Sequence, residues 1–432
     1  MRSTKYLFVL IFITFNINLN GQHKTLIENY LQKIDTFKYV DYNEIYDYAI
    51  AAYNLSLQTK DTFYLGRTAK ELGAYYIFKG KQDSALYYTN QAFKFSNTAK
   101  DSLNLSLTAN NLGVIYQNMA NYDSAYKYFM ISYNINIATD NKKELIADFN
   151  NLGMLYYVMN NYPKAIENFT IFLNMALENN DSTLITEAYI NLALTFNQLD
   201  KYNYALDFLN KSLRYTGKNI YKKVKILDNL GITYAYLENY KKAKEVLDIS
   251  YKIKLKYGFL SELIQSHLYY AEYFAMLSEF DSLESHLADA MQLCFETKNL
   301  RLTYYTLTMY GLFFREMGFI DKAIAYLINA EEIATNAKAY NYLLEIYQNL
   351  ADLYVSVENY QKAYEYQKKY TDLLLVNDTI REISPPISNE ELDNVNQATV
   401  FKNNNFYLFL ILGILMAITT LLIINLIYKN KH

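Results

Sequence analysis

Few residues of this chain have the type and spacing that catalysis or metal binding requires. His267 and His286 could share a metal ion, but a zinc site needs more ligands than these two, so packed or solvated imidazoles are expected. Ser124 and Lys127 form a Ser-x-x-Lys pattern without a companion motif. Cys294 is the single cysteine and is expected to be a buried apolar residue. Phosphate-binding loops, paired cysteines and Gly-x-Ser-x-Gly motifs are absent. We therefore expect no enzymatic activity, cofactor or metal.

The elements that would position these residues follow from an internal repeat. Small residues return at steps of 40 residues, with one step of 38 between Ala193 and Gly231. Such self-similarity predicts a stack of supersecondary units that bury their apolar faces against one another. The small residues are Gly73, Gly113, Gly153, Ala193, Gly231, Ala271, Gly311 and Ala351.

Each unit has the pattern of two amphipathic helices, A and B. In one unit, Gly153 and Tyr156 share a helix face, and Ala165, Phe169 and Phe172 share the next. The small residue of helix A and the alanine twelve residues later suit close helix packing, where a larger side chain would cost about 1–3 kcal/mol. Leu283 replaces this alanine in one unit and predicts a locally altered helix crossing.

Helix starts and turns repeat in the same register. Two units have Phe259 and Ala339 where the others have a strong N-cap residue twelve positions before the small residue. Asn-Tyr marks four A–B turns, and Pro163 follows one of them, as the first turn of a helix allows. The shortened step is placed near residues 215–217, before helix A. The N-cap residues are Asp61, Asp101, Asn141, Asp181, Asn219 and Asn299.

This pattern resembles the tetratricopeptide repeat family over residues 61–376. The resemblance implies an all-α solenoid of about eight units of 40 residues. Residues 22–60 are expected to form a degenerate capping helix pair. In the family, A helices line a concave groove that holds extended peptides or helices. By that resemblance, the peptide-binding residues would be Arg67, Lys70, Asn110, Asn150, Tyr157, Asp228, Tyr236, Arg315 and Gln348.

Both ends of the chain have features of membrane targeting. Residues 1–21 combine Arg2 and Lys5 with an apolar run, as in a secretory signal peptide. Residues 406–428 carry no charge and would span about 34 Å as a helix, enough for a bilayer core. A flexible tether is expected over 377–405 and a short cytoplasmic tail over 429–432. These features predict a single-pass protein of the inner membrane with its repeats on the periplasmic side.

The net charge of −3, without a basic stripe, argues against nucleic-acid binding. The sequence therefore favours a non-enzymatic, membrane-tethered scaffold that binds a protein or peptide in its groove. The alternative is a signal-transduction receptor whose cytoplasmic output module, a helix-turn-helix regulator or histidine kinase, is lost or supplied by another chain. Because only four residues follow Tyr428 in this sequence, we expect such a module to come from another chain.

Overall fold

The computed structural model describes residues 21–36, 42–297, 299–337 and 339–375, and in these ranges it contains helices and no strands. The predicted tether, membrane helix and tail lie outside the described residues, as does the signal segment before Gly21. Among the residues described, no helix has both the length and the apolar character needed to cross a membrane.

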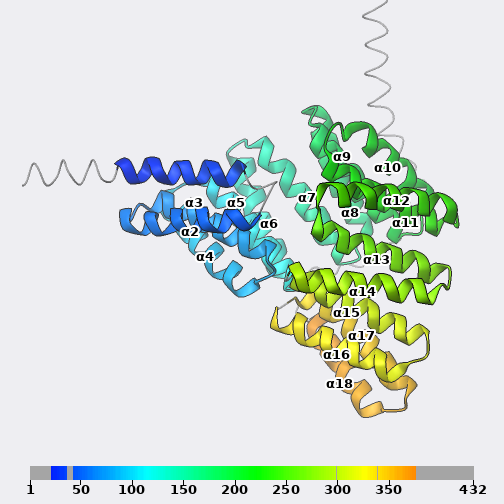
Figure 1. Ribbon diagram of the computed structural model, residues 1–432. Helices are drawn as coiled ribbons and strands as arrows, with labels where there is room; N and C mark the ends of the chain where they lie inside the picture. The colour runs from blue at the N-terminus through cyan, green and yellow to red at the C-terminus, as the bar shows by residue number, and fades with distance from the viewer. Residues whose placement is uncertain (1–20, 37–41, 298, 338, 376–432) are drawn as a thin grey trace, which may run out of the picture.

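The described chain is a solenoid of antiparallel helix pairs, preceded by a helix over residues 21–36 and by α2 (Tyr42–Thr59) (Figure 1). The A helices are α3 (Thr62–Phe78), α5 (Ser102–Asn118), α7 (Lys142–Val158), α9 (Ser182–Gln198), α11 (Ile220–Tyr236), α13 (Leu260–Met276), α15 (Leu300–Glu316) and α17 (Tyr340–Ser356). The B helices are α4 (Gln82–Ala99), α6 (Tyr122–Ala138), α8 (Tyr162–Glu178), α10 (Tyr202–Tyr215), α12 (Tyr240–Tyr257), α14 (Phe280–Thr297), α16 (Ile320–Asn336) and α18 (Tyr360–Leu375).

Side-chain caps begin the A helices where the sequence predicted them. All six predicted Asp and Asn residues accept a hydrogen bond from a backbone N–H of the first turn, which satisfies a group that the helix leaves unpaired. Phe259 and Ala339 provide no such bond. Pro163 lies in the first turn of α8. The shortened step is also confirmed, because α10 has 14 residues and ends at Tyr215.

The repeating glycines allow the two helices of a unit to pack closely. A Cβ atom added at Gly153 would lie 2.5 Å from Phe169 Cε1, and one added at Gly311 would lie 2.5 Å from Leu327 Cγ. The bulky residue sixteen positions later therefore fills the space that the glycine leaves. The alanine twelve positions later is buried beside it, as at Ala165 and Ala323. Large side chains such as Phe169 and Phe208 complete this core.

The A helices form the inner layer of the coil. Each A helix contacts the next one along the chain, from α3 to α17. The B helices from α4 to α16 each pack between their own A helix and the following one. The last A helix, α17, also contacts α5, and its residue Tyr340 packs against the apolar cluster that includes Phe129 and Leu155. The superhelix thus returns on itself, and side chains from distant A helices meet inside it.

Candidate functional site

Six side chains from five A helices meet inside the superhelix and form the inner cluster. Tyr305 of α15 lies at its centre, within electrostatic range of Tyr157, Tyr236, Tyr269, Glu272 and Glu345. These neighbours come from α7, α11, α13 and α17, so they are separated by up to 188 residues along the chain (from 157 to 345). Only the return of the superhelix brings them together.

Tyrosine and glutamate give this cluster an acidic, hydrogen-bonding character. The Tyr236 hydroxyl donates to Glu272 Oε1 at 2.7 Å, and its ring stacks on Tyr202 at 4.9 Å. Burial raises the pKa of Tyr305, and the negative charges of Glu272 and Glu345 raise it further. The tyrosine hydroxyls therefore remain protonated donors at physiological pH.

The two carboxyl groups of the inner cluster differ in their partners. Burial raises the pKa of Glu272, and the Tyr236 hydrogen bond opposes that effect. Burial among the surrounding helices also raises the pKa of Glu345, although its side chain keeps contact with water. Within the described residues, neither the Glu345 carboxylate nor the hydroxyls of Tyr269 and Tyr305 form a hydrogen bond or ion pair. These groups retain hydrogen-bonding capacity that a ligand could use.

A chain of polar contacts joins the three neighbouring A helices α7, α9 and α11. Asn191 Nδ2 donates to Asn150 Oδ1 at 2.7 Å, and Asn150 Nδ2 donates to Glu187 Oε1 at 3.3 Å. Lys222 Nζ then contacts Glu187 Oε2 at 3.3 Å. Asn150 therefore binds the neighbouring repeat in this conformation, and a ligand would have to replace or extend these contacts.

The predicted binding residues do not form one surface. Tyr157 and Tyr236 belong to the inner cluster. Near the N-terminal end, Arg67 contacts Glu28 at 3.1 Å and Lys70 contacts Glu71 at 2.7 Å. Toward the C-terminal end, Arg315 donates to Asn349 and Glu316, and Gln348 is exposed. Asn110 is buried and supports Asp148 through a hydrogen bond.

The expected placement of Asp228 in the groove requires correction. The residue is 2% exposed, and its carboxylate contacts Lys254 Nζ at 2.6 Å, while Ser250 donates to its other oxygen at 2.7 Å. Burial raises the pKa of Asp228 to about 6, against the effect of Lys254. The buried ammonium of Lys254 on α12 needs this carboxylate, because a buried charge without an opposite partner would cost free energy. Asp228 therefore joins the two helices of its own repeat and does not face a ligand.

Sequence reasoning missed four members of the inner cluster: Tyr269, Glu272, Tyr305 and Glu345. Tyr305 and Glu345 occupy the register six residues before the small residue, the same register as Arg67 and Glu187. That register was available from the sequence. The meeting of these side chains could not be predicted from the sequence, because it depends on how far each repeat rotates relative to the preceding one.

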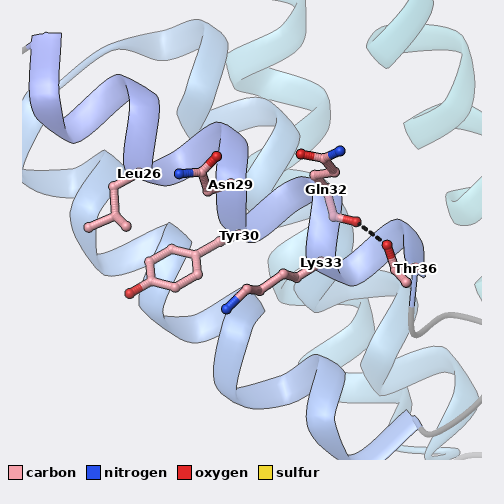
Figure 2. A pocket seen from close by; sticks show the side chains of 6 residues that line it. All are labelled: Leu26, Asn29, Tyr30, Gln32, Lys33 and Thr36. Atoms are coloured by element: carbon pink, nitrogen blue, oxygen red, sulfur yellow. Dashed lines mark hydrogen bonds between the residues drawn. The ribbon is translucent and has the colours of Figure 1, made fainter.

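A shallow hollow on the helix over residues 21–36 is a second surface that could bind a ligand (Figure 2). All six lining residues come from this one helix, and Thr36 Oγ1 donates to the Gln32 carbonyl within it at 2.9 Å. Lys33 Nζ lies 4.9 Å from the centre of the Tyr48 ring. Because no other element contributes to the lining, the hollow offers fewer converging groups than the inner cluster. Its residues are Leu26, Asn29, Tyr30, Gln32, Lys33 and Thr36.

Comparison with known families and structures identifies the repeat. Residues 108–136 and 301–375 each match a family model described as tetratricopeptide repeat. A Rap protein complexed with Competence and Sporulation Factor has a similar fold, with a TM-score of 0.54 and 12% identity over 82% of this chain and 98% of that one. The Rap conjugation gene regulator of plasmid pLS20, in complex with the Phr* peptide, gives a TM-score of 0.51 and 12% identity over 82% and 97%. No curated protein sequence matches the chain.

Proposed function

We propose that this chain, a tetratricopeptide-repeat solenoid, is a non-enzymatic scaffold that binds an extended peptide segment of a partner inside its superhelix. The observation that carries the proposal is the inner cluster, in which Tyr269, Tyr305 and Glu345 have hydrogen-bonding capacity that no described residue uses. Tyr269 and Tyr305 are partly buried and Glu345 is exposed, so water reaches these groups where no protein partner does. A bound peptide would supply that partner.

The chemistry of the inner cluster favours a peptide with a lysine or arginine side chain. Glu272 and Glu345 provide negative charge in a partly enclosed setting, where a charge-assisted hydrogen bond is stronger than in water. The faces of the surrounding tyrosine rings attract cations as well. The two similar folds described above were both obtained with a bound factor or peptide, which supports the same class of ligand for this solenoid.

We further propose that the scaffold is held at the inner membrane by residues 406–428, with its repeats on the periplasmic side. The support for this part is the sequence pattern of the two ends. Membrane fractionation followed by protease digestion of intact spheroplasts tests it. Recovery of the chain in the soluble fraction, or protection of the repeats from the protease, would contradict the proposal.

Site-specific photocrosslinking in cells tests the peptide-binding proposal directly. A photoreactive phenylalanine analogue is placed at Tyr305 of the full chain, and crosslinked peptides are identified by mass spectrometry. The matched control places the same analogue at Tyr87, a tyrosine that is 57% exposed on α4. We expect a defined partner at Tyr305 and none at Tyr87.

A second variant makes the test specific for the carboxyl groups. Replacing both Glu272 and Glu345 with glutamine keeps side-chain size and removes the negative charge. Crosslinking at Tyr305 should then fall at least about tenfold, which corresponds to the loss of about 1.4 kcal/mol of binding free energy. Equal crosslinking at Tyr305 and Tyr87, or no effect of the double substitution, would contradict binding at the inner cluster.

A further inference from the structure

Three potential metal ligands lie together on the two helices of one repeat and form what we call the outer cluster. His267 projects from α13, and His286 and Asp289 project from α14. His267 Nδ1 lies 3.0 Å from His286 Nδ1 and 3.6 Å from Asp289 Oδ2. All three ligand atoms are within 4.8 Å of one another.

The two separations that involve His267 are close to the edges of a zinc coordination tetrahedron. Zinc lies at about 2.0–2.1 Å from nitrogen and carboxylate ligands, so two tetrahedral ligands are about 3.3 Å apart. The observed 3.0 and 3.6 Å bracket this value. His286 and Asp289 are also three residues apart on α14, a spacing that places both on one helix face. We propose that His267, His286 and Asp289 form a zinc site with a fourth position open to solvent or to a partner.

The surroundings hold both imidazole rings in orientations suited to a metal ligand. The Tyr251 hydroxyl of α12 lies 3.4 Å from His267 Nε2, the nitrogen opposite the proposed metal, where metal-binding histidines usually have a hydrogen-bond partner. The His286 ring stacks on Tyr270 at 4.8 Å and on Phe274 at 5.4 Å. Few rotamers are therefore open to either ring.

The charges near the outer cluster permit a cation. Lys254 and Lys244 both lie within electrostatic range of the histidines, but Lys254 is paired with Asp228 at 2.6 Å and Lys244 with Asp248 at 3.0 Å. The Asp289 side chain is 54% exposed and gives the ion a route from solvent.

A zinc ion here would join the two helices of an irregular repeat. The pair α13–α14 has Leu283 where the other units usually have alanine, and the chain has one cysteine, so a disulfide within the chain cannot serve this purpose. The ion would bridge α13 and α14 from outside while Leu283 fills the space between them.

Zinc titration of the full chain, prepared metal-free and without a polyhistidine tag, tests the proposal. Competition with a chromophoric chelator should give one zinc per chain, and cobalt substitution should give the visible absorption of a tetrahedral ion. Zinc should also raise the midpoint of thermal unfolding, because it binds the folded state.

Matched variants separate this site from incidental binding. His286→Phe keeps the stacking on Tyr270 and should weaken zinc binding more than about 100-fold, beyond the range expected for loss of an outer hydrogen bond. Tyr251→Phe keeps the ring that packs on His267 and should weaken binding about tenfold. Glu284→Gln, an exposed carboxyl on the same helix, and His23→Gln should leave it unchanged.

Circular dichroism of each variant confirms that the helices remain folded. Failure of the full chain to bind zinc, or equal binding by wild type, His286→Phe and Asp289→Asn, would overturn the zinc site and leave a hydrogen bond between two imidazoles. Neither result depends on whether a peptide binds inside the superhelix.

Discussion

The inner and outer clusters share helix α13 and were assembled in different ways. Tyr269 and Glu272 extend from α13 into the superhelix, whereas His267 extends from the same helix toward α12 and α14. The outer cluster draws on residues 251–289, which belong to adjacent helices. The inner cluster draws on residues 157–345, which belong to five repeats.

This difference determines how each cluster should respond to damage. A local cluster needs only its own helix pair and the neighbouring helix to be folded. A cluster built across the superhelix needs every intervening repeat to keep its rotation, because small errors in each unit add along a solenoid. Substitutions in any of the repeats between Tyr157 and Glu345 should therefore disturb the inner cluster, whereas fewer of them should disturb the outer cluster.

Removal of the buried Asp228 carboxylate should have the largest effect and should harm both clusters. Asp228→Ala leaves the Lys254 ammonium buried without its partner, which typically costs about 3–5 kcal/mol of stability. Urea unfolding followed by circular dichroism measures the change. The double substitution Asp228→Leu with Lys254→Met should recover most of the loss, and an equal loss in both variants would contradict the ion-pair explanation.

A bulky residue at Gly311 should disrupt the inner cluster and spare the outer one. Gly311→Val forces α15, which carries Tyr305, away from Leu327 and should destabilise the chain by about 1–3 kcal/mol. Photocrosslinking at Tyr305 should be lost while zinc binding at α13–α14 persists. The control Ile328→Ala, on an exposed face of α16, should stay within about 0.5 kcal/mol of wild type. Loss of zinc binding in Gly311→Val would show that the outer cluster is not local.

Substitution of two tyrosines of the inner cluster should distinguish a hydroxyl that forms a structural hydrogen bond from a hydroxyl that forms none with the described residues. Tyr236→Phe removes the donor to Glu272 and should cost about 1 kcal/mol of unfolding free energy at pH 7. Tyr305→Phe removes a hydroxyl that has no partner among the described residues and should stay within about 0.5 kcal/mol. Equal effects in chemical unfolding would contradict the assignment of partners.

The smallest expected effect is a change in the pH dependence of stability. The pKa of Glu345 is raised in the folded state, so the folded chain binds the proton more tightly than the unfolded chain. Stability contributed by this group therefore falls as pH rises above its ordinary pKa of 4.5. Glu345→Gln should match wild type near pH 4 and be slightly more stable at pH 8, within about 0.5 kcal/mol. A variant that is less stable at pH 8 would indicate a partner for this carboxylate.

Much of the architecture could be predicted because it depends on local chemistry. The spacing of the small residues, Asn and Asp at helix starts, and the shortened step before Asn219 each act within one unit, and the structure confirms them. The sequence also placed His267 and His286 in one unit. Asp289 was missed, although its spacing of three residues from His286 places both on one helix face. That both residues approach His267 could not be predicted, because it depends on how α13 and α14 cross.

The repeat, its register and its helix caps were determined by the amino-acid sequence alone, since a missing Cβ or a capping carboxylate acts on atoms a few residues away. Tertiary structure decided that Asp228 faces Lys254 and that Tyr157 and Glu345 approach the same tyrosine. The contact of Asp228 with Lys254 depends on how α11 and α12 cross within one repeat. The approach of Tyr157 and Glu345 to the same tyrosine depends on the rotation between successive repeats, summed from α7 to α17. Side-chain packing at every interface sets that rotation, and no single spacing in the sequence records the sum.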